Sequence, residues 1–263
     1  MKVIFLALLT FLLLAGCSTD NTANLNSPAN SVNTSTSTGK KPPVLVELFT
    51  SEGCSNCPPA DANLAFMETK QPMPEADLIT LGFHVDYFND RGWEDPYSSA
   101  DYTRRQSQYS KLMKLDNFYT PQMVVDGQFQ FVGSDAQKTE ASIRAAAKSP
   151  KAEVMLKPGG AKLEIDIRGV PQHTASTIYL AIAEDGLMSE VKAGGNRGKS
   201  LAHISVVRKF GLAGKLTPEQ SSFNVVLNVP EESAWKKENL KYVAFIQEDA
   251  SGKIIGVGRA KAV

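Results

Sequence analysis

The sequence predicts an α/β domain followed by an all-β antiparallel sandwich, preceded by an export signal and a polar tether. Strand and helix patterns alternate over residues 43–150, whereas short strand patterns separated by Gly, Pro, Asn and Asp follow each other over residues 151–263. The first pattern is typical of α/β domains and the second of antiparallel sandwiches. The predicted division is therefore one domain over residues 43–150 and another over residues 151–263.

Residues 1–16 are predicted to be a lipoprotein signal peptide. Lys2 provides a charged start, and the apolar run that follows it ends at Leu14, which is too short to span a bilayer comfortably. Small residues then precede Cys17, as at a cleavage site before a lipid-modified cysteine. We expect Cys17 to carry lipid. An ordinary signal peptide and a retained transmembrane anchor are the alternatives.

Residues 17–42 are predicted to be a disordered tether rich in Ser, Thr and Asn, because so polar a segment cannot bury enough apolar surface to order itself. Ser18, and not Asp, follows Cys17, which resembles outer-membrane sorting in Gram-negative cells. The expected location is therefore the cell envelope, with the lipid anchor on the periplasmic side.

The first domain should contain strands and helices in alternation. Asp126-Gly127 favours a hairpin turn, and Ser134 or Asp135 is expected to cap the last helix. The predicted elements are strand Val44–Thr50, helix Ala60–Lys70, strand Leu78–Tyr87, helix Ser99–Lys114, strands Gln122–Val125 and Gln128–Val132, and a helix ending at Lys148.

The second domain should be built from short strands alone. Their apolar residues alternate with polar ones, as in strands with one buried face. The predicted strands are Ala152–Leu156, Leu163–Ile167, Thr177–Ala183, Phe223–Val229, Tyr242–Gln247 and Ile254–Val257.

Cys54 and Cys57 are separated by two residues at the predicted junction between a strand and a helix. A helix N-terminus stabilises a thiolate, so we expect a lowered pKa for the Cys54 thiol. Cys54 is predicted to be the nucleophile and Cys57 the resolving thiol. Because Pro58 follows Cys57, Cys57 should avoid the helical region, and the helix should begin at Pro58 with Cys57 as its N-cap. A permanent structural disulfide is the alternative, although so short a loop would add little stability.

Several segments together resemble an exported bacterial thioredoxin-like family catalogued as a domain of unknown function. The resemblance implies a thioredoxin-like fold with a cis peptide bond before Pro121, and it implies that Thr120 and Pro121 position the substrate. It implies no activity, because the family has none assigned. The segments are Leu48–Asp61, Phe83-His84-Val85-Asp86-Tyr87, Gly92-Trp93-Glu94-Asp95-Pro96 and Tyr119-Thr120-Pro121-Gln122.

Two further sets of polar residues are candidates for chemistry. Glu47 lies within the apolar strand before the dithiol, where a buried carboxylate could accept the proton of the resolving thiol. A Glu47 that reaches solvent or pairs with Lys or Arg is the alternative. His84 and Asp86 share one face by period-two alternation, as a relay, a metal pair or a structural hydrogen-bonded pair would require.

The segment Ala193–Ser200 formally satisfies a relaxed phosphate-loop pattern, but no buried parallel strand precedes it. We interpret it as a basic, Gly-rich loop that docks on the first domain, where Arg197, Lys199, His203 and Arg208 could bind an anion, and we expect no nucleotide.

The chain contains 28 Lys and Arg residues and 28 Asp and Glu residues, so no basic excess indicates binding to nucleic acid.

The predicted function is that of a thiol-disulfide oxidoreductase acting on envelope proteins or small thiols, without a cofactor or a resident metal. One alternative is a copper-handling module that uses Cys54 and Cys57 and, in one variant, His84, since copper(I) tolerates few ligands. The other is a non-catalytic envelope protein whose second domain binds a partner.

Overall fold

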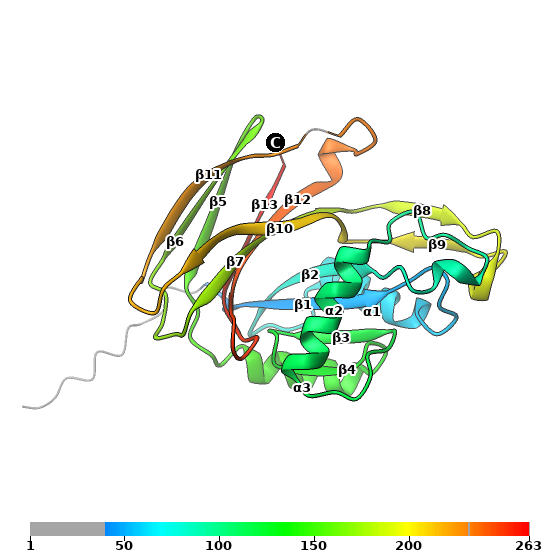
Figure 1. Ribbon diagram of the computed structural model, residues 1–263, viewed down its shortest axis with the longest axis horizontal. Helices are drawn as coiled ribbons and strands as arrows, with labels where there is room; N and C mark the ends of the chain where they lie inside the picture. The colour runs from blue at the N-terminus through cyan, green and yellow to red at the C-terminus, as the bar shows by residue number, and fades with distance from the viewer. Residues whose placement is uncertain (1–39, 231, 263) are drawn as a thin grey trace, which may run out of the picture. The chain divides into compact units, whose positions relative to one another are not determined.

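The computed structural model describes residues 40–230 and 232–262, so the predicted signal peptide, Cys17 and most of the predicted tether lie outside the described residues. The helices and strands are shown in Figure 1. In chain order they are β1 (Pro43–Thr50), α1 (Pro58–Lys70), β2 (Asp77–His84), α2 (Ala100–Leu112), β3 (Gln122–Val125), β4 (Phe129–Val132), α3 (Ala136–Ala146), β5 (Glu153–Gly159), β6 (Lys162–Arg168), β7 (Ser176–Glu184), β8 (Leu187–Glu190), β9 (Ser200–His203), β10 (Val206–Leu216), β11 (Phe223–Asn228), β12 (Leu240–Glu248) and β13 (Ile254–Lys261).

The fold is mixed α/β, with one large mixed sheet and additional antiparallel sheets. The large sheet has eight strands in the order β13-β12-β7-β10-β2-β1-β3-β4. Strands β1 and β2 are parallel, and β1 is antiparallel to β3. A three-stranded sheet, β11-β6-β5, and a two-stranded ribbon, β8-β9, complete the described strands.

The large sheet takes strands from both sides of the predicted boundary at residue 150. Strand β10 begins beside β2, where Val206 pairs with Gly82, and the Gly82 N–H donates to the Ser205 carbonyl at 2.8 Å. Without β10 that edge of β2 would leave backbone groups unpaired. The second half is therefore not a separate β-sandwich in this structure. Its strands β5, β6 and β11 pack instead against strands of the shared sheet.

The two faces of β1 are buried by different helices. Val46 and Leu48 belong to a core cluster that includes Leu64 of α1 and Ile143 of α3. Neighbouring Phe49 belongs to another cluster, which includes side chains of α2 and of β7, β12 and β13. This alternation explains why the strand reads as continuously apolar, because both of its faces are covered.

Local signals in the sequence place several element boundaries correctly. The Ser99 side chain caps α2 by accepting from the Asp101 N–H at 3.2 Å, and Asp135 caps α3 by accepting from the Lys138 N–H at 2.9 Å. Asp126 and Gly127 both have positive φ, at 49° and 66°, as the predicted hairpin turn requires.

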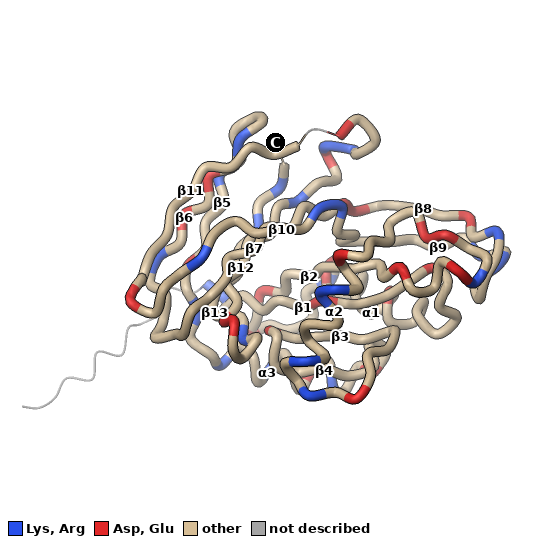
Figure 2. The backbone as a smooth tube through the Cα atoms, viewed as in Figure 1, with Lys and Arg blue, Asp and Glu red and all other residues tan. Residues whose placement is uncertain are grey.

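Charges of both signs are interspersed along the backbone (Figure 2), as the equal numbers of acidic and basic residues lead one to expect. Within the two described ranges, the structure contains no helix of the length and apolar character needed to cross a membrane.

Candidate functional site

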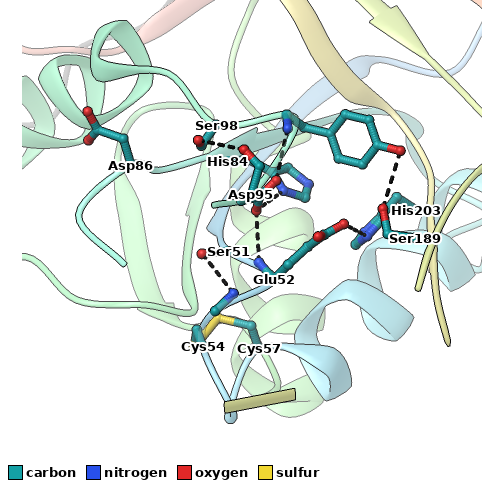
Figure 3. Close-up of polar contacts among 12 residues, drawn as sticks. Ser51, Glu52, Cys54, Cys57, His84, Asp86, Asp95, Ser98, Ser189 and His203 are labelled. Carbon is teal, nitrogen blue, oxygen red and sulfur yellow. Dashed lines mark hydrogen bonds and ion pairs between the residues drawn. A yellow bond between two sulfur atoms is a disulfide. The ribbon is translucent and has the colours of Figure 1, made fainter. Parts of the chain in front are cut away.

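A disulfide joins Cys54 and Cys57 in the turn between β1 and α1 (Figure 3). The Cys57 N–H donates to the Cys54 carbonyl at 3.2 Å, which closes the turn. Cys57 is the N-cap of α1, with helical φ and ψ of −78° and −37°, and Pro58 occupies the first helical position. The predicted helix start and cap position are therefore confirmed, but Cys57 does not avoid the helical region, as a residue before proline was expected to do.

Both sulfur-bearing residues are buried, Cys54 at 4% exposed and Cys57 at 0%. Their cover is the short segment Gly194–Asn196, which we call the covering loop. Asn196 Nδ2 donates to the Cys54 carbonyl at 2.8 Å and to the Glu52 carbonyl at 2.9 Å. A Cβ on Gly195 would lie 2.9 Å from the Gly53 carbonyl oxygen, so only glycine permits this approach. The predicted docking of this loop is confirmed.

Two carboxylate–histidine pairs lie near the disulfide, and Glu52 connects them (Figure 3). His84 Nδ1 is 2.7 Å from Asp95 Oδ2, and the same oxygen accepts from the Glu52 N–H at 2.8 Å. The Glu52 side chain in turn lies 2.9 Å from His203 Nε2. The two imidazole rings meet edge to face with centroids 5.0 Å apart. Residues from the dithiol turn, β2, its exit loop and β9 thus form one buried polar network.

The charges of this network shift the pKa values of its members. Burial lowers the pKa of His84, but the Asp95, Asp61 and Glu52 carboxylates together raise that pKa by more, so the imidazole is more basic than usual. Burial alone would raise the pKa of Asp95, yet His84 and two backbone N–H donors hold it below its usual range. Both shifts favour the charged form of the group concerned, so each member of the pair favours the charge of the other.

Asp61 extends the polar network onto α1. It is partly buried, and burial raises the pKa of its carboxyl, while His84, Thr50 and His203 lower it in part. The net direction is upward. A carboxyl that holds its proton more tightly than usual therefore lies near the N-terminus of the helix that carries Cys57.

Glu47 is buried on the face of β1 that α2 covers, opposite to α1. Its carboxylate accepts from Arg105 Nε at 2.6 Å and from the Tyr109 hydroxyl. Burial raises the pKa of Tyr109 well above its ordinary value, so the phenol stays protonated and donates. These contacts match the alternative interpretation, in which Glu47 pairs with a basic residue. They do not place it beside the cysteines.

The prediction that His84 pairs with Asp86 is wrong, because the partner of His84 is Asp95. Strand β2 ends at His84, so period-two alternation does not continue to Asp86, which accepts instead from the Thr103 hydroxyl. Figure 3 shows Asp86 turned away from the His84–Asp95 pair. Trp93 anchors the exit loop by donating its Nε1–H to Glu52 Oε2 at 2.8 Å.

The peptide bond between Thr120 and Pro121 is cis, as the resemblance implies. The positioning role of Thr120 and Pro121 stays a prediction. In the part of the chain that the structure describes, no group of three or more His, Cys, Asp or Glu side chains is arranged to hold a metal ion.

Of the four basic residues of the predicted anion site, three have partners within the protein, and the anion site stays a prediction. His203 is bound to Glu52, Arg208 pairs with Glu184 at 3.2 Å, and Lys199 donates to Asn196 Oδ1 at 3.0 Å. These basic groups therefore have partners within the protein. The docking of the covering loop was the correct part of that interpretation.

The sequence analysis assigned no role to Glu52, Asp61 and Asn196, and it gave His203 a different role, in an anion site. Asp61 could have been found, since it stands four residues after Cys57 and therefore on the same helix face. Asn196 and His203 come from a distant part of the chain, and no local pattern connects them to the cysteines.

Two solved structures of other proteins resemble this fold over most of the chain. A structure of a protein from Agrobacterium tumefaciens has 26% sequence identity and a TM-score of 0.71, over 85% of this chain and 96% of that one. HBP35 of Porphyromonas gingivalis has 14% identity and a TM-score of 0.61, over 84% of this chain and 75% of that one, a likeness of fold alone. No curated protein matches the chain significantly.

The sequence profile of a family described as "Protein of unknown function (DUF1223)" matches residues 45–247. This span includes the dithiol turn, both carboxylate–histidine pairs and the covering loop. The chain therefore belongs to the DUF1223 family of proteins of unknown function.

Proposed function

We propose that this protein is an exported thiol-disulfide oxidoreductase that uses Cys54 and Cys57. The observation that carries the proposal is the disulfide at the N-terminus of α1, with Cys57 as the N-cap. Unpaired N–H groups and the helix dipole stabilise a thiolate at such a position. The order strand, dithiol, helix, strand, helix and hairpin also supports a thioredoxin-like arrangement for residues 43–150.

The exposure of the two cysteines to solvent indicates which sulfur reacts first. Cys54 keeps a small exposed fraction and its neighbours Ser55 and Asn56 are exposed, whereas Cys57 is fully buried. A substrate sulfur therefore reaches Cys54 first. Cys54 forms the mixed disulfide with the substrate, and Cys57 then attacks Cys54 and releases the substrate thiol.

The covering loop restricts which substrates can react. Asn196 is bound to the Cys54 carbonyl, whereas Ser55 and Asn56 are exposed, so we infer that substrates approach on the side of Ser55 and Asn56. Small thiols and extended peptide segments fit such an approach better than the rigid surface of a folded protein. This favours small thiols, or unfolded proteins in the envelope, as substrates.

The location is proposed from the sequence. The signal-like residues 1–16, Cys17 and the polar segment after it favour a lipid anchor on the periplasmic side of the envelope. An oxidising envelope is also where a protein thiol pair cycles through a disulfide.

The Cys57→Ala variant tests the proposed function. It should accumulate a mixed disulfide at Cys54, because the resolving step is lost, and mass spectrometry of the trapped adduct would identify the substrate. Cys54→Ala is the matched control and should trap nothing. If neither variant forms an adduct, and the reduced wild type binds copper(I) tightly without turnover, the copper-binding alternative replaces the proposal. The equilibrium potential against glutathione would give the direction of electron flow.

A further inference from the structure

Asp61 lies one helical turn after Cys57 and has no role in the function proposed above. Cys57 already has helical φ and ψ, and the Asp61 N–H donates to its carbonyl at 3.1 Å. Residues four apart on a helix lie on one face, and the Cα–Cβ bonds of a helix tilt toward its N-terminus. The Asp61 side chain is therefore directed toward the Cys57 end of α1.

The polar groups near Asp61 come from several elements. Thr50 lies at the end of β1 and is the register partner of His84 on β2. The Thr50 hydroxyl and the imidazoles of His84 and His203 lower the pKa of the Asp61 carboxyl and so offset part of the effect of burial. Asp95 adds a like charge from the exit loop, and Glu52 completes the network by holding His203.

Glu47 and Asp61 are both candidates for proton transfer to or from the dithiol, but they differ in their partners. Glu47 is committed to an ion pair with Arg105, so protonating it would leave a buried guanidinium without its counter-charge. Asp61 has imidazoles and a hydroxyl as neighbours instead, and burial favours its neutral form. Of these two acids, Asp61 is the one that can gain and lose a proton at low cost.

We propose that Asp61 is the proton acceptor for Cys57 when the mixed disulfide is resolved, an inference that rests on the proposed oxidoreductase function. The Cys57 thiol transfers its proton to the Asp61 carboxylate, and the resulting thiolate attacks the Cys54 sulfur. The Cys54–Cys57 bond forms and the bond between Cys54 and the substrate sulfur breaks. The substrate leaves as a thiolate and takes a proton from water. The dithiol is thereby oxidised by two electrons and the substrate disulfide is reduced.

The two chemical steps can be separated with an aromatic disulfide whose thiolate product is coloured. Attack by Cys54 on this probe releases the first equivalent, and resolution by Cys57 releases the second. Asp61→Asn keeps the shape of the side chain but cannot accept a proton. It should slow the second phase by about ten-fold or more near neutral pH and leave the first unchanged. The pH profile of the second phase should also move upward, toward that of an unassisted thiol.

Glu68→Gln is the matched control, because Glu68 is another partly buried carboxylate on α1 and pairs with Lys241. It should leave both phases unchanged. Asp61→Glu should restore part of the second-phase rate. An unaltered second phase and pH profile in Asp61→Asn would overturn the proposal. If wild-type protein shows no first phase, the oxidoreductase function itself fails, which is a distinguishable result.

A measurement on the wild type covers the case in which Asp61→Asn does not fold. Carbon NMR of labelled aspartate can follow the Asp61 carboxyl in the oxidised and the reduced protein. If Asp61 exchanges a proton with Cys57, the two groups titrate as a coupled pair, and the apparent pKa of Asp61 must differ between the two states. The same titration curve in both states would refute the proposal.

Discussion

The covering loop is expected to control how fast reagents reach the dithiol, and Asn196→Ala tests this directly. Asn196 is fully buried, and its Nδ2 is the donor to both the Glu52 and the Cys54 carbonyls. The substitution removes both hydrogen bonds while leaving the cysteines and the helix start intact. It should therefore raise the population of molecules in which the loop is open.

The size of the effect follows from the Glu52 carbonyl, which loses its donor, because the Cys54 carbonyl still accepts from the Cys57 N–H. A buried acceptor left without a partner costs about 1–3 kcal/mol, and water that enters the truncated site offsets part of that cost. We expect a net change of about 2 kcal/mol in the opening free energy. Since about 1.4 kcal/mol corresponds to a factor of ten, the open population should rise about 30-fold.

The assay is alkylation of the reduced protein, followed by mass spectrometry at Cys54. When closing is fast relative to alkylation, the rate is proportional to the open population, so it should also rise about 30-fold. Asn224→Ala is the control. Asn224 is exposed on β11, and its side chain donates to Glu164 of β6 and not to the dithiol turn. An alkylation rate equal to that of the wild type, at an unchanged urea midpoint, would show that these bonds do not hold the loop closed.

Three other outcomes are expected. Glu47→Gln should lower the free energy of unfolding by about 3–5 kcal/mol, because it leaves Arg105 buried without its counter-charge. Urea unfolding measures this, and a slower thiol exchange at neutral pH in folded variant protein would instead support the proton-transfer role predicted from the sequence. The raised pKa of His84 means that its contribution to stability is complete below its ordinary value of 6.5 and is lost as the pH rises through the raised value. The difference in unfolding free energy between wild type and His84→Asn should therefore be larger at about pH 6 than at about pH 9, and an equal difference at both would contradict the charged pair with Asp95. Mass spectrometry of the mature protein should find lipid on Cys17, whereas an unmodified N-terminus at another residue would exclude the anchor.

The parts of the structure that depend on neighbouring residues could be predicted from the sequence. Pro58 as the first helical residue follows from the fixed φ and the missing N–H of proline, whereas Cys57 keeps helical φ and ψ against the restriction that a following proline imposes. The turn at Asp126-Gly127 follows from its need for positive φ. Ser99 likewise caps α2, because its side-chain oxygen accepts a hydrogen bond from a backbone N–H in the first turn.

The parts that depend on distant pairing could not be predicted in this way. Strand β10 carries glycines and charges that hide its strand pattern, and nothing within it indicates β2 as a neighbour. The His84 partner was misassigned because period-two alternation holds only inside a strand, and β2 ends at His84. Asn196 reaches the dithiol turn through the ribbon β8-β9, which the sequence analysis did not predict.

The distance along the chain between the dithiol and the covering loop sets an order of events during synthesis and folding. The disulfide links residues only 3 apart, whereas the bond from Asn196 to the Cys54 carbonyl spans 142 residues. Contacts between near neighbours form early, and those that close long loops form late. While the chain is still emerging, both thiols are therefore open to any oxidant that is present. The thiol pair is enclosed only after the second half of the protein has folded against it.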